Sequence, residues 1–269
     1  MTDWYSLDEW FCARLAQTIH DAEMVFHGFA SPCATIAMHL AKRTHAPHMV
    51  LIEGATYAVN PDPWFIPPTS NDRALMHDAS YVMSFEELFD AGARGDLDRM
   101  FLSGAQIDRL GNTNVTLIGT RDAIGVKLGG GGGGCNLSAT VGALTLWTTR
   151  HRSARTLVDR CDFVTDLGHR TPDGTRAELG HRGGGPEMLV TELGVFKFCD
   201  GVAVLVERFP DVEPAEIERA TGFAFGTADV PLVPPPPAEV IELVRALDPL
   251  GVRQREFAPR ELARMFELR

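Results

Sequence analysis

The order of apolar and polar residues near the N-terminus predicts a helix, a strand, a second helix and a second strand. A capping box formed by Ser6 and Glu9 marks the start of the first helix. The strands are the short apolar runs at 24–26 and 49–52, and the second helix follows Ser31, where a proline suits the first helical turn. A strand, a helix and a strand in this order predict a right-handed βαβ unit with parallel strands.

Apolar runs along the rest of the chain extend this pattern. A second capping box, Ser84 with Glu87, predicts another helix. Tight turns separate the runs at 188–191, 195–198 and 202–205, which predicts consecutive antiparallel strands. Other strands are expected at 100–102, 115–118, 144–147 and 156–158, and other helices from Pro214 and after the prolines at 234–237. We therefore expect an α/β fold: a three-layer, open, mostly parallel sheet with helices on both faces and an antiparallel extension.

No internal repeat or clear linker divides the sequence. The expectation is a single domain over residues 1–269, in which 232–269 form a C-terminal connector and a helical tail. The proline-rich segment 60–72 contains two aromatic residues, Trp64 and Phe65. It is either a packed surface loop or a lid over a binding site.

The composition is that of a globular protein with excess negative charge. Apolar residues make up 45% of the chain, charged residues 23%, and the net charge is −11. Nucleic-acid binding needs clustered Lys and Arg, so this balance argues against it. No apolar run reaches the roughly 18 residues of a membrane span, and no signal peptide is evident at Met1. The five cysteines form no CxxC pair, so we expect reduced thiols in a cytoplasmic protein.

The strand at 49–52 ends at a carboxylate followed by a glycine, Glu53 and Gly54. Open α/β sheets bind ligands at the carboxyl ends of their strands, so Glu53 is a candidate for chemistry. The alternative is a strand cap that points to water. Gly54 permits the close approach of a substrate or of another backbone segment. The helix after Ser31 begins on the same rim of the sheet, and a helix N-terminus favours an anionic group.

Six consecutive glycines, residues 129–134, are the most unusual local feature. Successive N–H groups in such a segment can form a nest for an anion. The match to a dinucleotide-binding pattern is trivial for polyglycine, and Lys127 precedes the run, unlike the lysine of a Walker motif. We expect an anion or oxyanion site here; the alternative is a flexible surface loop. Cys135, directly after the glycines, is either a thiolate at this site or a small buried side chain.

Other reactive side chains show weaker patterns. His45 and His48 are close in sequence, as are Asp162, Asp166 and His169, but neither group has a further ligand at a metal-site spacing. We therefore expect no metal site. The G-x-S-x-G motif is absent, which excludes the commonest class of serine hydrolase.

Four segments spread over most of the chain resemble the β subunit of class I coenzyme A transferases, with glutaconate CoA-transferase the closest in pattern. They are His45-Ala46-Pro47 with the strand that ends at Glu53 and with Pro61; Gly104–Asp108 with Gly111–Asn114; the glycine run; and Leu189–Phe198 with Thr221–Phe223. The family usually shows Glu-Ser-Gly where this chain has Glu53-Gly54-Ala55.

The resemblance implies the CoA-transferase fold and the transfer of CoA between an acyl-CoA thioester and a carboxylic acid. Glu53 would carry the reaction as a glutamyl-CoA thioester, and its ionised carboxylate would need no separate base. Coenzyme A would be a substrate, with no cofactor bound permanently. Gly130, Gly131, Gly132 and Gly133 would bind CoA or stabilise the oxyanion, and Ser31, Gly54, Gln106 and Asn136 would contact substrate.

In this family the site lies between an α-like and a β-like half. The resemblance therefore implies a partner α subunit of similar fold, in a heterodimer or a larger hetero-oligomer. Two other enzymes on the same scaffold are alternatives: a CoA-thioester hydrolase of the ring-opening type found in steroid degradation, and a decarboxylase. A non-catalytic alternative is a sugar-phosphate sensor, but no basic helix-turn-helix pattern accompanies the chain.

Overall fold

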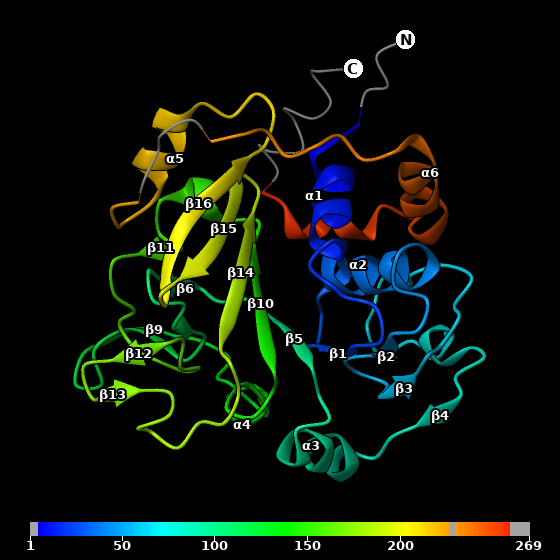
Figure 1. The fold of residues 1–269 in the computed structure, drawn as a ribbon, viewed down its shortest axis with the longest axis horizontal. Helices are drawn as coiled ribbons and strands as arrows, with labels where there is room; N and C mark the ends of the chain where they lie inside the picture. Colours follow the sequence, from blue (N-terminus) through cyan, green and yellow to red (C-terminus); the bar gives the residue numbers. More distant parts are fainter. Residues whose placement is uncertain (1–4, 226–229, 259–269) are drawn as a thin grey trace. The chain divides into compact units, whose positions relative to one another are not determined.

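The computed structural model describes residues 5–225 and 230–258 (Figure 1). Contacts divide these residues into two compact units, and the chain passes between the units more than once. Unit 1 comprises 5–91, 97–101 and 234–258, and unit 2 comprises 92–96, 102–225 and 230–233. The single domain expected over 1–269 stays a prediction.

Unit 1 contains a mixed sheet with the strand order β5-β1-β2-β3-β4. Its central strand β1 (Met24–His27) pairs in parallel with β2 (Val50–Ile52) and with β5 (Arg99–Leu102). Two short strands, β3 (Ala58–Val59) and β4 (Tyr81–Val82), continue the sheet in antiparallel fashion. Helices α1 (Leu7–Ala16), α2 (Pro32–Arg43) and α6 (Ala238–Leu247) pack on one another, and α2 also packs on β1 and β2 (Figure 1).

The local signals that predicted these elements are present in the structure. The Ser6 N–H donates to the Glu9 carboxylate at 3.0 Å, as a capping box requires, and α1 ends at Ala16. Pro32 occupies the first turn of α2, where its missing N–H is harmless. Strands β1 and β2 are parallel and are joined through α2, so the predicted βαβ unit is confirmed.

The remaining helices of unit 1 are short or begin in this unit. They are the 3₁₀ helices η1 (Arg73–Met76) and η3 (Val252–Glu256) and the α-helix α3 (Phe85–Arg94), whose last turn belongs to unit 2. The second capping box is confirmed, because the Ser84 N–H donates to Glu87 at 2.7 Å and the Glu87 N–H donates to Ser84 Oγ at 3.2 Å.

Unit 2 contains the strand order β16-β15-β14-β10. Strands β10 (Ala143–Thr148) and β14 (Pro186–Thr191) are parallel, and β15 (Gly194–Cys199) and β16 (Val202–Arg208) add an antiparallel extension. The three consecutive antiparallel strands predicted for this segment are therefore confirmed. Helix α5 (Pro214–Ala220) begins at the predicted proline.

Smaller sheets complete unit 2. They are β11 (Leu157–Val158) with β6 (Gln106–Asp108) and β7 (Thr113–Asn114), β12 (Arg170–Thr171) with β13 (Gly174–Thr175), and β8 (Leu117–Gly119) with β9 (Ile124–Lys127). Two short helices are α4 (Gly134–Ser138) and η2 (His151–Ser153). The strand predicted at 115–118 starts late, because Asn114 Oδ1 accepts from the amides of Thr116 and Leu117 and closes a turn there.

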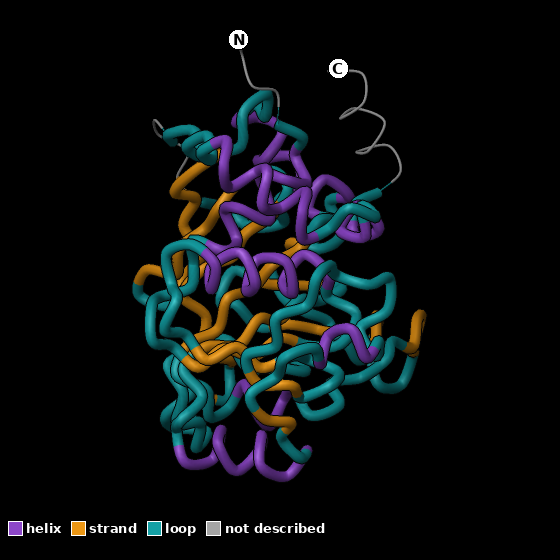
Figure 2. The backbone as a smooth tube through the Cα atoms, turned by 90° about the vertical axis from the view of Figure 1, so that its right-hand side faces the viewer, coloured by secondary structure: helices purple, strands orange, loops and turns teal. Residues whose placement is uncertain are grey.

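Parallel strands joined through helices, with antiparallel additions, make this an α/β fold, as predicted. Loops and turns fill much of the remaining backbone (teal in Figure 2). The predicted C-terminal connector leads into α6, whereas 259–269 lie outside the described residues. In the part of the chain that the structure describes, no helix is long and apolar enough to cross a membrane.

Candidate functional site

Glu53 lies in the turn that joins β2 to β3. Its N–H donates to the Ala58 carbonyl at 2.9 Å, and its own carbonyl accepts from the Tyr57 N–H at 3.0 Å. These two bonds reverse the chain within a few residues and turn the Glu53 side chain into the interior. The residue is only 1% exposed. The alternative of a strand cap that points to water is therefore wrong.

Two buried histidines bind the two oxygens of this carboxylate. His27, the last residue of β1, places Nε2 2.9 Å from Oε2 of Glu53. His39, in the middle of α2, places Nε2 2.8 Å from Oε1. Both histidines are at most 1% exposed. The other ring nitrogen of His27 lies 2.8 Å from the Gly28 carbonyl, which can only accept, so Nδ1 of His27 carries a proton.

The histidines decide the ionisation of Glu53. Burial alone would raise the pKa of this carboxyl group, because a charged group loses its hydration. The charge of His27 and the hydrogen bonds from both imidazoles outweigh burial and lower the pKa of Glu53 to about 2. At neutral pH the site therefore holds a carboxylate anion, which can act as a nucleophile without a separate base.

Gly54 makes the approach of β1 to this turn possible. A Cβ atom at position 54 would lie 2.5 Å from the His27 carbonyl oxygen and 2.8 Å from that of Gly28. The Gly54 backbone nitrogen lies 3.1 Å from His27 Nε2. The sequence left open whether Gly54 permits the close approach of a substrate or of another backbone segment, and the structure shows the approach of a backbone segment. Contact of Gly54 with substrate stays a prediction.

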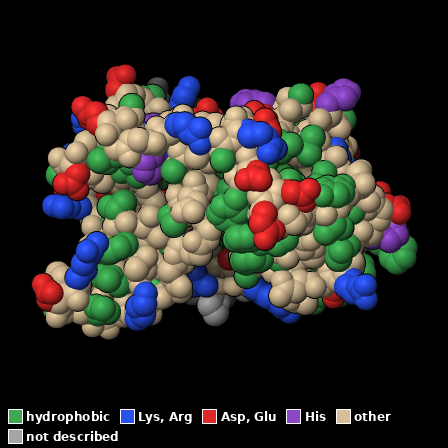
Figure 3. Space-filling model, turned by 90° about the horizontal axis from the view of Figure 1, so that it is seen from below, with side chains coloured by type: hydrophobic (Ala, Val, Ile, Leu, Met, Phe, Trp, Pro, Cys, Tyr) green, Lys and Arg blue, Asp and Glu red, His purple; other side chains and the backbone are tan. Residues whose placement is uncertain are grey.

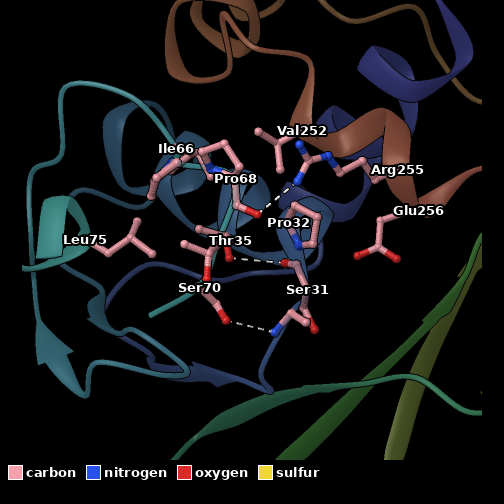
Figure 4. Close-up of a pocket in the computed structure, with 13 residues that line it drawn as sticks. Ser31, Pro32, Thr35, Ile66, Pro68, Ser70, Leu75, Val252, Arg255 and Glu256 are labelled. Atoms are coloured by element: carbon pink, nitrogen blue, oxygen red, sulfur yellow. Dashed lines mark hydrogen bonds between the residues drawn. The ribbon is translucent and has the colours of Figure 1, made fainter. Parts of the chain in front are cut away.

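A cavity of about 310 Å³ opens in unit 1 at the N-terminus of α2 (Figure 4). Its wall includes Ser31 and Thr35 of α2 and part of the proline-rich loop, residues 66–70. Thr35 Oγ1 donates to the Ser31 carbonyl at 3.1 Å and lies 3.4 Å from His27 Nε2. The cavity is thus separated from the His27–Glu53 pair by a single side chain. Trp64 does not line the cavity; its ring packs on His77, and it is 78% exposed.

The glycine segment belongs to unit 2 and leads directly into α4. Gly130 and Gly132 have φ angles of +88° and +52°, which residues other than glycine rarely adopt. Within the described residues, the backbone amides of Gly131, Gly132 and Gly133 donate no hydrogen bond. Three successive donors without partners suit an anion. The proposed CoA-binding or oxyanion role of Gly130–Gly133 stays a prediction.

The two other residues predicted to contact substrate also lie in unit 2. Gln106 is buried in β6, and its Oε1 accepts from Asn114 Nδ2 at 2.8 Å and from the Asp162 N–H at 2.9 Å. Asn136 is exposed on α4. The structure brings Ser31, Glu53 and Gly54 together in unit 1, whereas Gln106, the glycine segment and Asn136 lie in unit 2.

Sequence reasoning missed His27 and His39. A usable signal existed for His27, because the carboxyl ends of parallel neighbouring strands meet at one edge of a sheet. The histidines that did attract attention have other roles: His45 contacts the Ile19 carbonyl, and His48 pairs with Asp21 at the surface. In the described part of the chain, no three or more His, Cys, Asp or Glu side chains are grouped to hold a metal ion.

Comparisons with known sequences give the chain a family. A sequence profile described as "Coenzyme A transferase" matches residues 11–218. The B-type subunit of 3-oxoadipate CoA-transferase from Pseudomonas knackmussii is 30% identical over 248 residues, which cover 91% of this chain and 94% of that protein. The B-type subunit of glutaconate CoA-transferase from Acidaminococcus fermentans is 27% identical over 256 residues, which cover 91% of this chain and 93% of that protein.

Solved structures agree with the sequence comparisons. A chain of the decarboxylase AibA/AibB superposes with a TM-score of 0.80 at 29% identity, over 94% of this chain and 98% of that chain. Glutaconate CoA-transferase from Acidaminococcus fermentans superposes with a TM-score of 0.81 at 24% identity, over the same shares, and supports the fold. The profile match covers most of the sequence, and the predicted resemblance is confirmed. The chain belongs to the coenzyme A transferase family.

Proposed function

We propose that the chain is the B-type subunit of a coenzyme A transferase and that Glu53 is its nucleophile. The enzyme would move CoA from an acyl-CoA thioester to a carboxylic acid. The observation that carries the proposal is the ionised Glu53, buried at the end of a parallel strand and linked to a cavity through His27 and Thr35.

The proposed reaction proceeds by exchange of acyl bonds. The Glu53 carboxylate attacks the thioester carbonyl, and the C–S bond breaks to give a mixed anhydride and CoA thiolate. The thiolate then attacks the Glu53 carbonyl of the anhydride, which releases the first carboxylate and leaves a glutamyl-CoA thioester. An acceptor carboxylate reverses the two steps and leaves with CoA.

Each attack forms an oxyanion, which needs hydrogen-bond donors. One well-placed donor contributes about 10²–10³ in rate. We assign this role, or the binding of CoA, to the amides of Gly130–Gly133, since three of them are without partners in the described chain. Ser31, Gly54, Gln106 and Asn136 are proposed as substrate contacts.

Exclusion of water is a second requirement, because water hydrolyses an anhydride. Burial keeps water away from Glu53 in the resting chain. The proline-rich loop supplies residues 66–70 to the wall of the cavity beside His27. We propose that this part of the loop covers the bound acyl group.

The names of the two relatives support a partner subunit, because each relative is the B-type subunit of its enzyme. Unit 1 exposes several large apolar side chains: Phe29, Trp64, Tyr81, Val82 and Phe85. Figure 3 shows hydrophobic side chains gathered with acidic ones on the face that it displays. Exposed aromatic side chains are typical of surfaces that bind another protein. We propose that an A-type subunit completes the enzyme and that this chain alone is inactive.

An assay with and without an acceptor tests the proposed function. The complex of both subunits is incubated with an acyl-CoA, and new acyl-CoA and free CoA are measured with and without a second carboxylic acid. The proposal expects new acyl-CoA that depends on the acceptor. The Glu53→Gln variant should lose at least about 10³-fold in rate, because the amide is a poor nucleophile. Glu86→Gln, at an exposed carboxylate of α3, should keep its rate.

Two results would contradict this proposal. Full transfer activity in Glu53→Gln would exclude Glu53 as the nucleophile. Free CoA that appears at the same rate without acceptor would identify a hydrolase instead. A decarboxylase is the second candidate, since AibA/AibB is 29% identical over nearly the whole chain. That activity would release CO₂ from a carboxylated acyl-CoA without any acceptor.

A further inference from the structure

Each oxygen of the resting Glu53 carboxylate is hydrogen-bonded to a buried histidine. Oε1 is bound by His39 at 2.8 Å and Oε2 by His27 at 2.9 Å. Together with 1% exposure, these bonds hold the side chain in one place. A nucleophile must present one oxygen to the thioester carbonyl. An oxygen that has given up its hydrogen bond is the more reactive one, so the opening of one contact favours attack.

The two histidines differ in what else they can bind. His27 Nε2, which donates to Glu53, also lies 3.4 Å from Thr35 Oγ1, an oxygen that can accept from it. His27 is held as well through Nδ1, by the Gly28 carbonyl at 2.8 Å. The imidazole of His39, in contrast, has Glu53 as its sole hydrogen-bond partner in the described chain. Loss of the Glu53 contact therefore leaves His27 with partners and His39 with none.

A chain of contacts connects the Oε2 atom of Glu53 with the cavity. Thr35 lines the cavity and contacts His27 Nε2, and His27 in turn contacts Oε2. Oε2 is therefore the oxygen linked to the cavity through these two side chains.

We propose that His27 and His39 are positioning residues for Glu53, with unequal roles. His39 anchors Oε1 throughout the reaction, and the His27–Oε2 contact is the one that opens to free the attacking oxygen. This assignment rests on the proposed function of Glu53 as nucleophile. Both histidines contact the Glu53 carboxylate and influence the reaction through it.

Other titratable groups lie near Glu53 and its two histidines, and a test must distinguish their effect on the pH profile from that of Glu53. On α2, Arg43 binds Asp62 of the proline-rich loop. This hydrogen bond is the main cause that lowers the pKa of Asp62; burial opposes it, and the charges of His39 and His77 lower the pKa further. Tyr57, in the turn after Glu53, has a pKa raised by burial. An Asp62→Asn variant of the complex therefore serves as a control for the acid limb of the pH profile.

The test compares His39→Ala with His27→Ala in the two-subunit complex. Displacement of a reacting group by about 1 Å can lower a rate about 10²-fold, so His39→Ala should lose about 10²-fold in kcat at pH 7. His27→Ala should lose less than about 10-fold, since the contact that opens is already gone. His39→Gln should recover part of the loss, because its amide N–H can reach Oε1. His48→Ala, which removes a surface histidine paired with Asp21, should change neither kcat nor KM.

The pH profile gives a readout that a purely structural role would not move. Without one imidazole, less of the increase that burial causes in the pKa of Glu53 is offset. The acid limb of the rate should move to higher pH in both alanine variants, and it should stay in place in Asp62→Asn. An unmoved limb in both variants, or a larger kcat loss in His27→Ala than in His39→Ala, would overturn the proposal.

A second measurement separates this inference from the proposed function. The infrared carboxyl bands of Glu53, identified by subtraction of Glu53→Gln spectra, report its titration without turnover. If they titrate at higher pH in the histidine variants although no transfer is detected, positioning holds and the nucleophile assignment fails. If transfer through Glu53 is shown but the bands do not move, positioning fails. Circular dichroism of each variant checks that the fold is intact.

Discussion

Glu53 in unit 1 and Asp166 in unit 2 are both buried carboxylates, with 1% and 3% exposure, yet their pKa values move in opposite directions. Asp166 accepts from Thr113 Oγ1 at 2.6 Å and from Ser138 Oγ at 3.3 Å. These neutral donors do not offset burial, so the pKa of Asp166 is raised. For Glu53, two imidazoles reverse the effect of burial and lower the pKa to about 2.

The comparison shows that the partners, more than burial, decide what a buried carboxylate can do. Asp166 has hydroxyl partners, and its backbone N–H and carbonyl also bond to Thr113, so its visible role is to join two segments of unit 2. Glu53 is held as an anion at the end of a parallel strand, beside a cavity. A buried charge that is kept ionised by specific partners is typical of functional sites.

A Gly54→Ala substitution should have the largest effect on the difference between Glu53 and Asp166. The new Cβ would meet the His27 carbonyl oxygen at 2.5 Å, and backbone atoms cannot move aside as a flexible side chain can. We expect the turn that carries Glu53 to move away from β1 and α2, so that Glu53 loses its contact with His39 as well as with His27, with at least about 10²-fold loss of transfer activity and a lower Tm. Gly28→Ala is the matched control, because no atom lies within 4 Å of a Cβ built at Gly28. Equal activity and Tm in the two variants would show that the close approach is unimportant.

A smaller effect, in the acid stability of the chain, would sharpen the contrast. The folded-state pKa of Glu53 lies near 2, below the ordinary 4.5, so its contribution to stability is present above about pH 4.5 and is lost as the pH falls toward 2. A shift of this size is worth on the order of 3 kcal/mol. Asp166 has a raised folded-state pKa, so its contribution is present below the ordinary 3.8 and is lost as the pH rises through the folded-state value.

Urea unfolding of Glu53→Gln and Asp166→Asn at a series of pH values measures how the contribution of each carboxylate to stability changes with pH. The advantage of the unmutated chain over Glu53→Gln should shrink as the pH falls from 4.5 toward 2. Its stability relative to Asp166→Asn should fall instead as the pH rises above 3.8. Differences with the same sign for both variants would remove the contrast between the two carboxylates.

Sequence patterns predicted the elements that local interactions decide. The βαβ unit around Glu53 follows from two apolar runs and a helix start, and all three are local signals. The histidines depend on tertiary structure. The register that pairs Phe26 with Ile52 brings the next residues, His27 and Glu53, together, and the packing of α2 on the strands supplies His39.

Two further features could not be predicted for different physical reasons. Strands β3 and β4 have two residues each, too few to show a periodicity. The glycine segment is conspicuous in sequence, but glycine adopts many backbone conformations. Its positive φ angles at Gly130 and Gly132 are therefore a result of the fold.

The central claim is that Glu53 carries CoA covalently, and mass spectrometry tests it most directly. The complex is incubated with an acyl-CoA in the absence of acceptor and digested with trypsin, which releases residues 44–73 as one peptide. We expect this peptide to gain the mass of CoA less one water, as a thioester, with fragment ions that place the addition on Glu53, and to lose this addition when a carboxylic acid is added. Transfer that proceeds with this peptide unmodified, or with CoA on another residue, would contradict the account.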